Sequence, residues 1–356
     1  MSKEADKVNH GPTLVIHGGA GIINPDNFPE SKQKEYIDAL NGALLAGYEI
    51  LKKGGDSIDA VEVSVRILED CPFFNAGKGS VFTLSGKNEL EASIMLGIDS
   101  HTAGACTLLR TVKNPITLAK TLLQDPENPH VFLGGIEAEK YAKSKGLEMV
   151  DPGYFWTKQR WKQHLDGLEK KKPENLKMLN DLDGGDSRDA DDPISMGTVG
   201  AIAVDINGII STATSTGGFN NKKDGRIGDT PLIACGTWAD NETCGVSGTG
   251  NGEFFIRHGV AHDVAARMKY LKESVQDAAS TVVKNLKKIG GDGGVIALDK
   301  YGNCKLINGI TSILIFVGIN DNFFYKVAMP FNTNGMFRGY IRVSEGVPYS
   351  YIFHEQ

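Results

Sequence analysis

Cysteine is scarce in this sequence, and no two cysteines form a CxxC pair. The five that occur are spread over 356 residues: Cys71, Cys106, Cys235, Cys244 and Cys304. An odd number of widely separated cysteines is not typical of a disulfide framework or of a zinc site. We therefore expect the protein to work in a reducing compartment, the cytoplasm.

Long apolar runs and excess positive charge are also missing. No segment approaches the roughly 20 apolar residues of a membrane-spanning helix. The run Leu14-Val15-Ile16, which follows a polar N-terminus, is too short for the core of a signal peptide. The 38 Lys and Arg residues are outnumbered by 44 Asp and Glu, which gives a formal net charge of -6. Because nucleic acids attract positive surfaces, this balance favours a small-molecule substrate and no nucleic-acid or membrane partner.

Three familiar catalytic or nucleotide-binding motifs are absent as well. The run His17-Gly18-Gly19-Ala20-Gly21 is similar to the oxyanion loop of serine esterases, but the sequence has no GxSxG motif. The glycines at 248 and 250 lack the third glycine of a dinucleotide fingerprint. The Gly-Lys pairs at 77–78 and 86–87 are not followed by Ser or Thr, as a P-loop requires.

Strand-like segments alternate with helix-like segments along the chain. Apolar spacing predicts helices at 30–53, 57–71, 116–123, 136–142, 254–268 and 275–289, and strands at 13–17, 90–97, 104–109, 198–205, 209–213, 232–236, 244–248 and 293–298. Asn207-Gly208 indicates a hairpin between two of these strands. Hydrophobic residues make up 40% of the chain, so we expect one large layered α/β unit with helices outside the sheets.

The chain changes character at the bond between Gly197 and Thr198. Residues 157–197 form a charged linker, with six aspartates between Asp181 and Asp192, which we expect to be disordered because it buries too little apolar surface. The residues from Thr198 to Asp205 are small and apolar, as in a buried strand. This junction suits a chain that is cut there; the alternative is a Thr that simply begins a strand after a loop.

Cleavage at this bond would make Thr198 a candidate nucleophile. Its new α-amine would have a pKa of roughly 7.7 to 8.0, close to the pH at which a general base works best. Its β-methyl group restricts χ1, so the hydroxyl can be held in one direction.

Polar groups that could serve this nucleophile follow in three places. Hydroxyl side chains are dense at 211–216. Arg226 and Asp229 place a cation and an anion three residues apart, which matches the α-carboxylate and α-ammonium groups of an amino acid, although an ordinary surface ion pair is the alternative. The loop 247–253 could form an oxyanion hole from backbone N–H groups and the Thr249 hydroxyl, or could be a plain tight turn.

Six motifs occur in one order that resembles the plant-type (type III) L-asparaginase and isoaspartyl peptidase family of N-terminal nucleophile hydrolases. They are the stretches at 17–21, 74–77, 197–201, 214–218, 225–229 and 247–253, and a further one lies at 330–336. The resemblance spans Thr13 to Gly339. It implies a four-layer αββα sandwich, built as one structural domain from an α subunit of residues 1–197 and a β subunit of residues 198–356.

The resemblance implies self-cleavage between Gly197 and Thr198 and assigns roles around the new terminus. Thr198 would be the nucleophile, with Thr216 hydrogen-bonded to it and Asn75 beside it. The Thr249 hydroxyl and the N–H group of Gly250 would form the oxyanion hole.

The implied reaction is hydrolysis of L-asparagine and of β-aspartyl (isoaspartyl) dipeptides, with no cofactor for the chemistry. Arg226 and the Gly252 N–H group would bind the substrate carboxylate, and Asp229 and the Gly250 carbonyl its amine. A structural sodium ion would be held by backbone carbonyls of Leu68, Glu69, Cys71, Phe74, Ala76 and Lys78. The family usually assembles as a dimer of αβ units.

Two features depart from the family pattern. Residues 306–325 interrupt what should be a short connection between strands, and Leu96 stands where we expect a polar residue after Met95. Neither feature removes a proposed catalytic residue. Two other functions stay open at this point: a glycosylasparaginase-like hydrolase, and a non-catalytic protein that is never cut.

Overall fold

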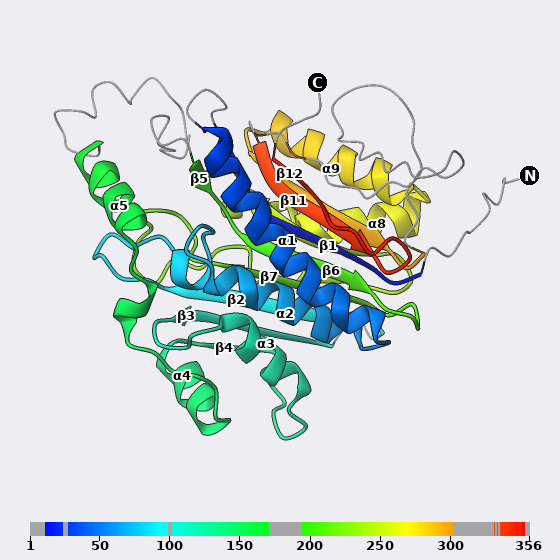
Figure 1. Ribbon diagram of the computed structural model, residues 1–356, viewed down its shortest axis with the longest axis horizontal. Coiled ribbons are helices and arrows are strands. Elements are labelled where there is room, and N and C mark those ends of the chain that lie inside the picture. Colours follow the sequence, from blue (N-terminus) through cyan, green and yellow to red (C-terminus); the bar gives the residue numbers. More distant parts are fainter. Residues whose placement is uncertain are drawn as a thin grey trace, which may run out of the picture.

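The computed structural model describes residues 11–23, 28–98, 102–170, 194–301, 331, 333 and 335–352. Within these ranges, helices, a large sheet, a small sheet and further helices follow one another as four layers (Figure 1). The αββα sandwich predicted from the sequence is therefore confirmed.

The large sheet contains nine of the described strands, eight of them in one row. From edge to edge the row is β12 (Tyr349–Tyr351), β11 (Gly335–Arg342), β1 (Thr13–Ile23), β6 (Val199–Val204), β7 (Ile210–Thr216), β2 (Leu90–Leu96), β3 (Ala103–Leu109) and β4 (Phe132–Gly134). The short strand β5 (Ile194–Met196) pairs with the end of β1. The small sheet has the order β10 (Gly293–Asp299), β9 (Cys244–Gly250) and β8 (Thr237–Ala239).

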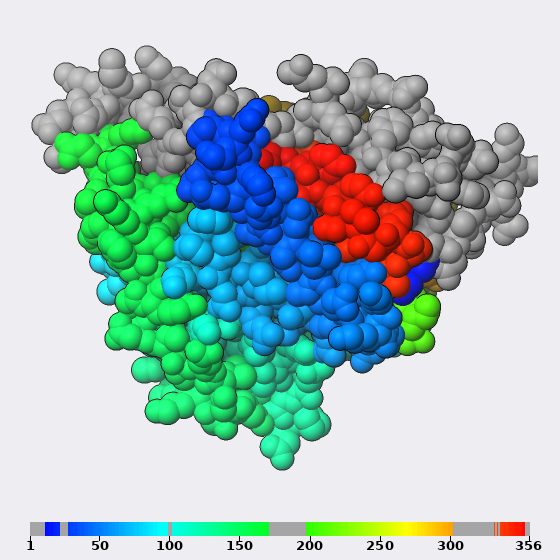
Figure 2. All heavy atoms as spheres, in the orientation of Figure 1, coloured from blue at the N-terminus to red at the C-terminus, as the bar shows by residue number. Residues whose placement is uncertain are grey.

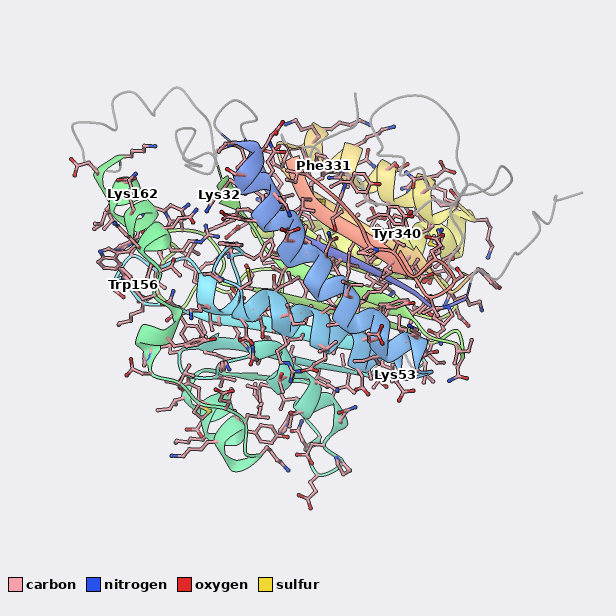
Figure 3. All side chains as sticks on the ribbon, in the orientation of Figure 1. Lys32, Lys53, Trp156, Lys162, Phe331 and Tyr340 are labelled. Atoms are coloured by element: carbon pink, nitrogen blue, oxygen red, sulfur yellow. The ribbon has the colours of Figure 1, made fainter. Side chains whose placement is uncertain are left out.

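Helices cover the outer faces of both sheets. The large sheet packs against α1 (Glu30–Lys52), α2 (Ser57–Asp70), α3 (Pro115–Gln124) and α4 (Gly135–Ser144), and the small sheet against α8 (Val260–Leu271) and α9 (Val275–Lys288). Figure 2 shows α1 in blue between the red strands β11 and β12 and the lighter blue α2. Figure 3 labels Lys32 and Lys53 at the two ends of α1 and Tyr340 on β11. None of the helices in the described residues is both long and apolar enough to cross a membrane.

Alternating side chains of the central strand β6 enter different cores. Val199, Ala201 and Ala203 pack toward α1 and α2, whereas Ile202 and Val204 pack between the two sheets. A third core lies between the small sheet and the pair α8 and α9. Successive strand residues point to opposite faces, and burying each Val or Ile contributes roughly 1.5–3 kcal/mol, so β6 is anchored on both sides. Because β6 lies between β1 and β7 in the sheet, the residues that follow Thr198 are held in place on both sides.

Three sequence-based expectations are wrong. A helix, α5 (Lys158–Lys170), stands at the beginning of the expected disordered linker, while 171–193 lie outside the described residues. The buried face of α5 is polar (Arg160, Gln163 and His164), so apolar periodicity could not indicate it. The segment 232–236 is a turn that precedes β8, and the helix expected at 254–268 is two helices, α7 (Gly252–His258) and α8, separated at Gly259 with φ 56°.

Other expectations concern residues that the structure does not describe. The interrupting segment at 306–325 lies outside the described residues, as do Cys304 and, within the motif at 330–336, Pro330, Asn332 and Asn334. Two short 3-10 turns, η2 (Gly77–Gly79) and η3 (Pro152–Phe155), complete the described elements.

Candidate active site

The junction between Gly197 and Thr198 lies between β5 and β6, deep in the large sheet. The Thr198 residue is only 5% exposed. Gly19 of β1 lies against the Gly197 peptide group: a Cβ on residue 19 would stand 3.0 Å from both the nitrogen and the oxygen of Gly197. Gly19 also has φ +110°, where side-chain-bearing residues are strained. Only glycine therefore lets β1 approach the bond so closely.

The small sheet contributes Thr249 to the same place. The Thr249 hydroxyl accepts a hydrogen bond from the Ala20 N–H group at 3.2 Å. It also lies 2.6 Å from the point where a Cβ on Gly197 would stand. The next residue, Gly250, has φ +154°, and a Cβ there would meet the Asp292 carbonyl at 2.3 Å. The end of β9 is thus packed against the residue whose carbonyl would be attacked.

Thr216 faces the junction through strand register. β6 and β7 are antiparallel, with Val199 opposite Ser215. One step further along this register places Thr198 opposite Thr216, and directly opposed residues on one face lie close together. The Thr216 hydroxyl accepts a hydrogen bond from the Gly218 N–H group at 3.0 Å. Thr198 and Thr216 therefore stand at matching positions of neighbouring strands, with Thr198 one residue before β6 begins.

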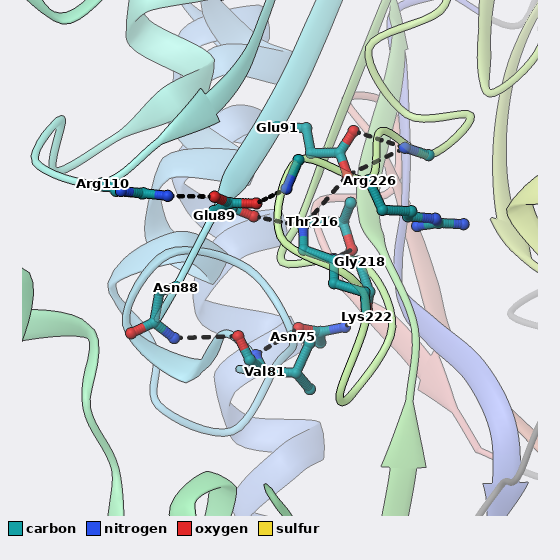
Figure 4. A network of polar contacts seen from close by, with 12 residues as sticks. Asn75, Val81, Asn88, Glu89, Glu91, Arg110, Thr216, Gly218, Lys222 and Arg226 are labelled. Atoms are coloured by element: carbon teal, nitrogen blue, oxygen red, sulfur yellow. Dashed lines mark hydrogen bonds and ion pairs between the residues drawn. The ribbon is translucent and has the colours of Figure 1, made fainter. Parts of the chain in front are cut away.

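Asn75 reaches this region through the turn after β7. Its side-chain amide donates to the Gly218 carbonyl at 2.8 Å and accepts from the Val81 N–H group at 3.0 Å (Figure 4). Its own carbonyl accepts from Gly217 N–H at 3.1 Å. Asn75 thus holds the two glycines that follow Thr216.

Arg226 and Asp229 lie against the same glycine, Gly252. A Cβ on Gly252 would stand 2.7 Å from Arg226 Nη2 and 2.8 Å from Asp229 Oδ1. Burial raises the pKa of the Asp229 carboxyl to about 7. Its Oδ2 atom is buried and makes no hydrogen bond in the described part of the chain. Asp229 therefore keeps one carboxylate oxygen that could accept a hydrogen bond from a cation.

A nearby glutamate also contacts Arg226. Glu253 accepts from Arg226 Nε at 3.0 Å and from Nη2 at 2.9 Å. The Phe219 ring stacks on the guanidinium, with its centroid 4.1 Å from Cζ. A cavity of about 470 Å³ opens here, lined by Phe219, Lys222, Lys223, Asp224, Gly225, Arg226 and Glu253.

Comparison with known protein families agrees with this geometry, since a family model described as asparaginase matches residues 10–323. The chain belongs to this asparaginase family. A relative in Escherichia coli (strain K12), named isoaspartyl peptidase, is 38% identical over 92% of both chains. A relative in Mus musculus, named isoaspartyl peptidase/L-asparaginase, is 39% identical over 82% of both chains.

Sequence reasoning missed the residues that support the Arg226 loop of this asparaginase-family chain. Glu89 accepts from the Gly225 N–H group at 2.8 Å, and Glu91 accepts from the Gly228 N–H group at 2.9 Å (Figure 4). The Lys222 ammonium lies 3.7 Å from Glu91 and donates to the Glu89 carbonyl at 2.8 Å. Burial raises the pKa of Glu91 and lowers that of Lys222.

One feature of the sequence could have indicated that Glu89 and Glu91 support this loop. Glu89 and Glu91 flank Leu90 at the start of an otherwise apolar strand. A carboxylate inside such a run is buried, and a buried carboxylate needs a partner.

His17 is a second residue whose contacts the sequence motifs did not indicate. Its Nε2 atom lies 2.9 Å from the Ser247 hydroxyl, which in turn lies 2.8 Å from the Thr214 hydroxyl. Burial lowers the pKa of His17 to about 3, opposed by the nearby backbone of Thr198. The imidazole is therefore neutral, and it joins the two sheets next to the junction.

The segment 68–78 can be tested as a sodium-binding loop. A Cβ on Gly77 would meet the Glu69 carbonyl at 2.3 Å, and a Cβ on Gly79 would meet the carbonyl of Phe74 at 2.1 Å and that of Pro72 at 2.7 Å. Backbone carbonyls thus crowd into the turn, and each keeps a second lone pair for a cation even when it accepts a hydrogen bond.

Side-chain ligands would not compete with these carbonyls. Among the described residues no cluster of three or more His, Cys, Asp or Glu side chains could hold a metal ion. The Lys78 side chain is directed elsewhere, with its ammonium 5.0 Å from the centre of the Tyr154 ring. Backbone carbonyl oxygens are the kind of ligand that a hard alkali cation takes.

Proposed function

We propose that this protein is a threonine amidohydrolase that cleaves itself between Gly197 and Thr198 and then hydrolyses L-asparagine and β-aspartyl dipeptides. One observation carries the proposal: the Gly197 peptide group lies between Gly19 and the Thr249 hydroxyl, directly before the buried Thr198. The names of the relatives in Escherichia coli and Mus musculus support the choice of substrates.

Self-cleavage would use the Thr198 hydroxyl as nucleophile. Its oxygen attacks the Gly197 carbonyl carbon, an ester bond forms to Oγ1, and the bond from Gly197 C to Thr198 N breaks while that nitrogen takes up the proton that the hydroxyl has lost. Water then hydrolyses the ester, which leaves a Gly197 carboxylate and a Thr198 with both a free hydroxyl and a free α-amine. The Thr249 hydroxyl, which lies against Gly197, would donate to the developing oxyanion together with the Gly250 N–H group.

The free α-amine of Thr198 would then act as the general base for turnover. It takes the hydroxyl proton as Oγ1 attacks the β-carbonyl of the substrate, and it passes this proton to the departing ammonia or peptide amine. Water next hydrolyses the β-aspartyl ester and restores the enzyme. Thr216 would hydrogen-bond the Thr198 hydroxyl, and Asn75 would hold the turn that fixes Thr216.

The substrate's α-carbon groups would be held at the space beside Gly252. Arg226, with the Gly252 N–H group, would bind the carboxylate. Asp229, with the Gly250 carbonyl, would bind the ammonium. The two charged side chains lie against the same glycine, with Arg226 Nη2 2.7 Å and Asp229 Oδ1 2.8 Å from the Cβ position of Gly252, so opposite charges are near enough together to bind one amino-acid zwitterion. Ordinary surface ion pairing does not account for Asp229, which is only 5% exposed.

Three further properties belong to this proposal. A sodium ion would be held by backbone carbonyls of the segment 68–78, where it would stiffen the turn that carries Asn75. The mature protein would be a dimer of αβ units. Its compartment would be the reducing cytoplasm, in keeping with the free thiols of Cys71, Cys106, Cys235 and Cys244.

The intact mass under denaturing conditions tests the first reaction. We expect two fragments in place of one 38.4 kDa chain, and a single uncut chain without activity for Thr198→Ala. Two fragments from Thr198→Ala would overturn the assignment of the nucleophile.

Substrate assays test the second reaction. Ammonia release from L-asparagine and amino-acid release from a β-aspartyl dipeptide are measured beside hydrolysis of a glycosyl-asparagine. We expect activity on the first two. Activity on the glycosylated substrate alone would indicate a glycosylasparaginase, and a single uncut mass without any activity would indicate a non-catalytic protein.

A further inference from the structure

Glu253 binds the guanidinium of Arg226 along only one edge of the group. The Glu253 carboxylate accepts from Nε at 3.0 Å and from Nη2 at 2.9 Å, a side-on fork. A guanidinium offers a second edge, formed by Nη1 and Nη2, that can also hold a carboxylate with two parallel hydrogen bonds. Glu253 therefore occupies one of two equivalent binding edges.

The second edge lies against glycines that surround the proposed substrate space. A Cβ on Gly228 would stand 2.9 Å from Arg226 Nη1, and a Cβ on Gly218 would stand 3.3 Å from the same atom. A Cβ on Gly252 would stand 2.7 Å from Nη2 and 2.8 Å from Asp229 Oδ1. The Nη1 and Nη2 atoms thus lie where three glycines carry no Cβ, and Asp229 lies against one of the same glycines.

Other contacts fix the plane of the guanidinium but not its rotation within that plane. The Phe219 ring covers one face at 4.1 Å from Cζ. The loop itself is held by Glu89 and Glu91 through backbone N–H groups. Stacking on an aromatic ring has no directional preference within the plane of the ring, so hydrogen bonds at one edge help to set how the guanidinium is turned.

We propose that Glu253 is a positioning residue that sets which edge of Arg226 receives the substrate carboxylate. It occupies the Nε/Nη2 edge, which leaves the Nη1/Nη2 edge for the substrate. Both Arg226 and Glu253 line the 470 Å³ cavity, so an uncovered Nε/Nη2 edge would offer a second, unproductive place for a carboxylate or another anion. This inference rests on the proposed carboxylate-binding role of Arg226.

The chain offers a matched control for the loss of such a fork. Arg267 donates from Nε to Glu273 Oε2 at 2.8 Å and from Nη2 to Oε1 at 2.6 Å. This is the same side-on geometry, on α8 and the turn after it, and Glu273 does not line the cavity. Glu273→Gln therefore reproduces the chemical change outside the proposed site.

Steady-state kinetics of the self-cleaved enzyme test the inference. For Glu253→Gln we expect the KM for L-asparagine to rise about tenfold, with kcat within about twofold of wild type, because a charged pair that orients a binding group is lost. The inhibition constant of the product L-aspartate should rise by a similar factor, and added sulfate should become an inhibitor. Glu253→Asp, which keeps the charge but reaches less far, should give a KM between the two, and Glu273→Gln should keep the wild-type values.

Opposite results would overturn the inference. An unchanged or lower KM in Glu253→Gln would show that the fork does not position Arg226, and so would equal effects in Glu253→Gln and Glu273→Gln. If Glu253→Gln stays uncut, Glu253→Asp decides alone: a raised KM supports the role, and a wild-type KM refutes it. A wild-type protein without activity on either substrate would refute the proposed function itself, which is a different outcome.

Discussion

Gly19 and Gly197 lie in such close contact that no side chain fits between them. A Cβ on residue 19 would stand 3.0 Å from both the nitrogen and the oxygen of Gly197, closer than such contacts normally occur. The first strand of the chain thus helps to fix the peptide group that precedes Thr198.

Gly19→Ala should slow or abolish self-cleavage. The added methyl group has to displace the Gly197 peptide group, and the φ of +110° strains any residue other than glycine. Gel electrophoresis of freshly purified protein over time gives the fraction cut. Gly42→Ala is the control, because nothing lies within 4 Å of a Cβ on that glycine of α1. Equal cleavage in the two variants would show that contact with Gly19 is not needed.

Thr249→Val should lower kcat by a factor on the order of 10² to 10³. The change removes one donor to the oxyanion while keeping the shape of the side chain. Thr249→Ser should retain most of the activity because it restores the hydroxyl. Thr212→Val is the control, since the Thr212 hydroxyl is buried on β7 and makes no hydrogen bond among the described residues. Wild-type kcat for a cleaved Thr249→Val would rule out the proposed oxyanion role.

The sequence predicted the parts of the site whose chemistry is local. Thr216, Arg226 and Asp229 stand out because hydroxyls or opposite charges occur in glycine-rich stretches, and the structure places them at one end of the sheet. The αββα layers likewise followed from alternating helical and strand periodicities together with the family resemblance.

What the sequence could not predict depends on contacts between distant segments. Glu89 and Glu91 bind the backbone of a loop more than 130 residues away, as the Glu91 contact to Gly228 shows with its separation of 137. The orientation of Arg226 by Glu253 is likewise a matter of geometry at a range of 27 residues. Helix α5 could not be predicted from apolar spacing because its buried face is polar.

Substrate capture should weaken below about pH 7. Burial raises the pKa of Asp229 to about 7, so at lower pH the carboxyl is neutral and cannot attract the substrate ammonium. Below about pH 7 the expected kcat/KM for L-asparagine falls about a hundredfold per pH unit, because both Asp229 and the Thr198 α-amine, whose pKa is roughly 7.7 to 8.0, take up a proton. A profile from pH 5 to pH 9 measures this. A kcat/KM that stays flat between pH 5.5 and pH 7.5 would contradict the assignment.

The same carboxyl should make the protein less stable as pH rises. An unfolded Asp releases its proton near pH 3.9, whereas folded Asp229 holds it until about 7. The folded state therefore binds more protons between these values, and the contribution of Asp229 to stability is present below pH 4 and is lost as pH rises to 7. Asp229→Asn should melt at a higher temperature than wild type at pH 8 and show little difference at pH 4.5. A gap of equal size at both values would assign the effect to something other than proton binding.

Lys222→Met should destabilise the protein by about 3–5 kcal/mol, because it leaves the buried Glu91 without its cationic partner. The double variant Lys222→Met with Glu91→Gln should recover part of this loss. A neutral glutamine costs less to bury, and its carbonyl oxygen can still accept from the Gly228 N–H group as Glu91 does. Scanning calorimetry measures both, with Lys223→Met as the control on an exposed neighbour, expected within about 0.5 kcal/mol of wild type. If Lys222→Met and Lys223→Met melt alike, the ion pair does not stabilise the Arg226 loop, and the backbone hydrogen bonds from Gly225 and Gly228 alone hold it in place.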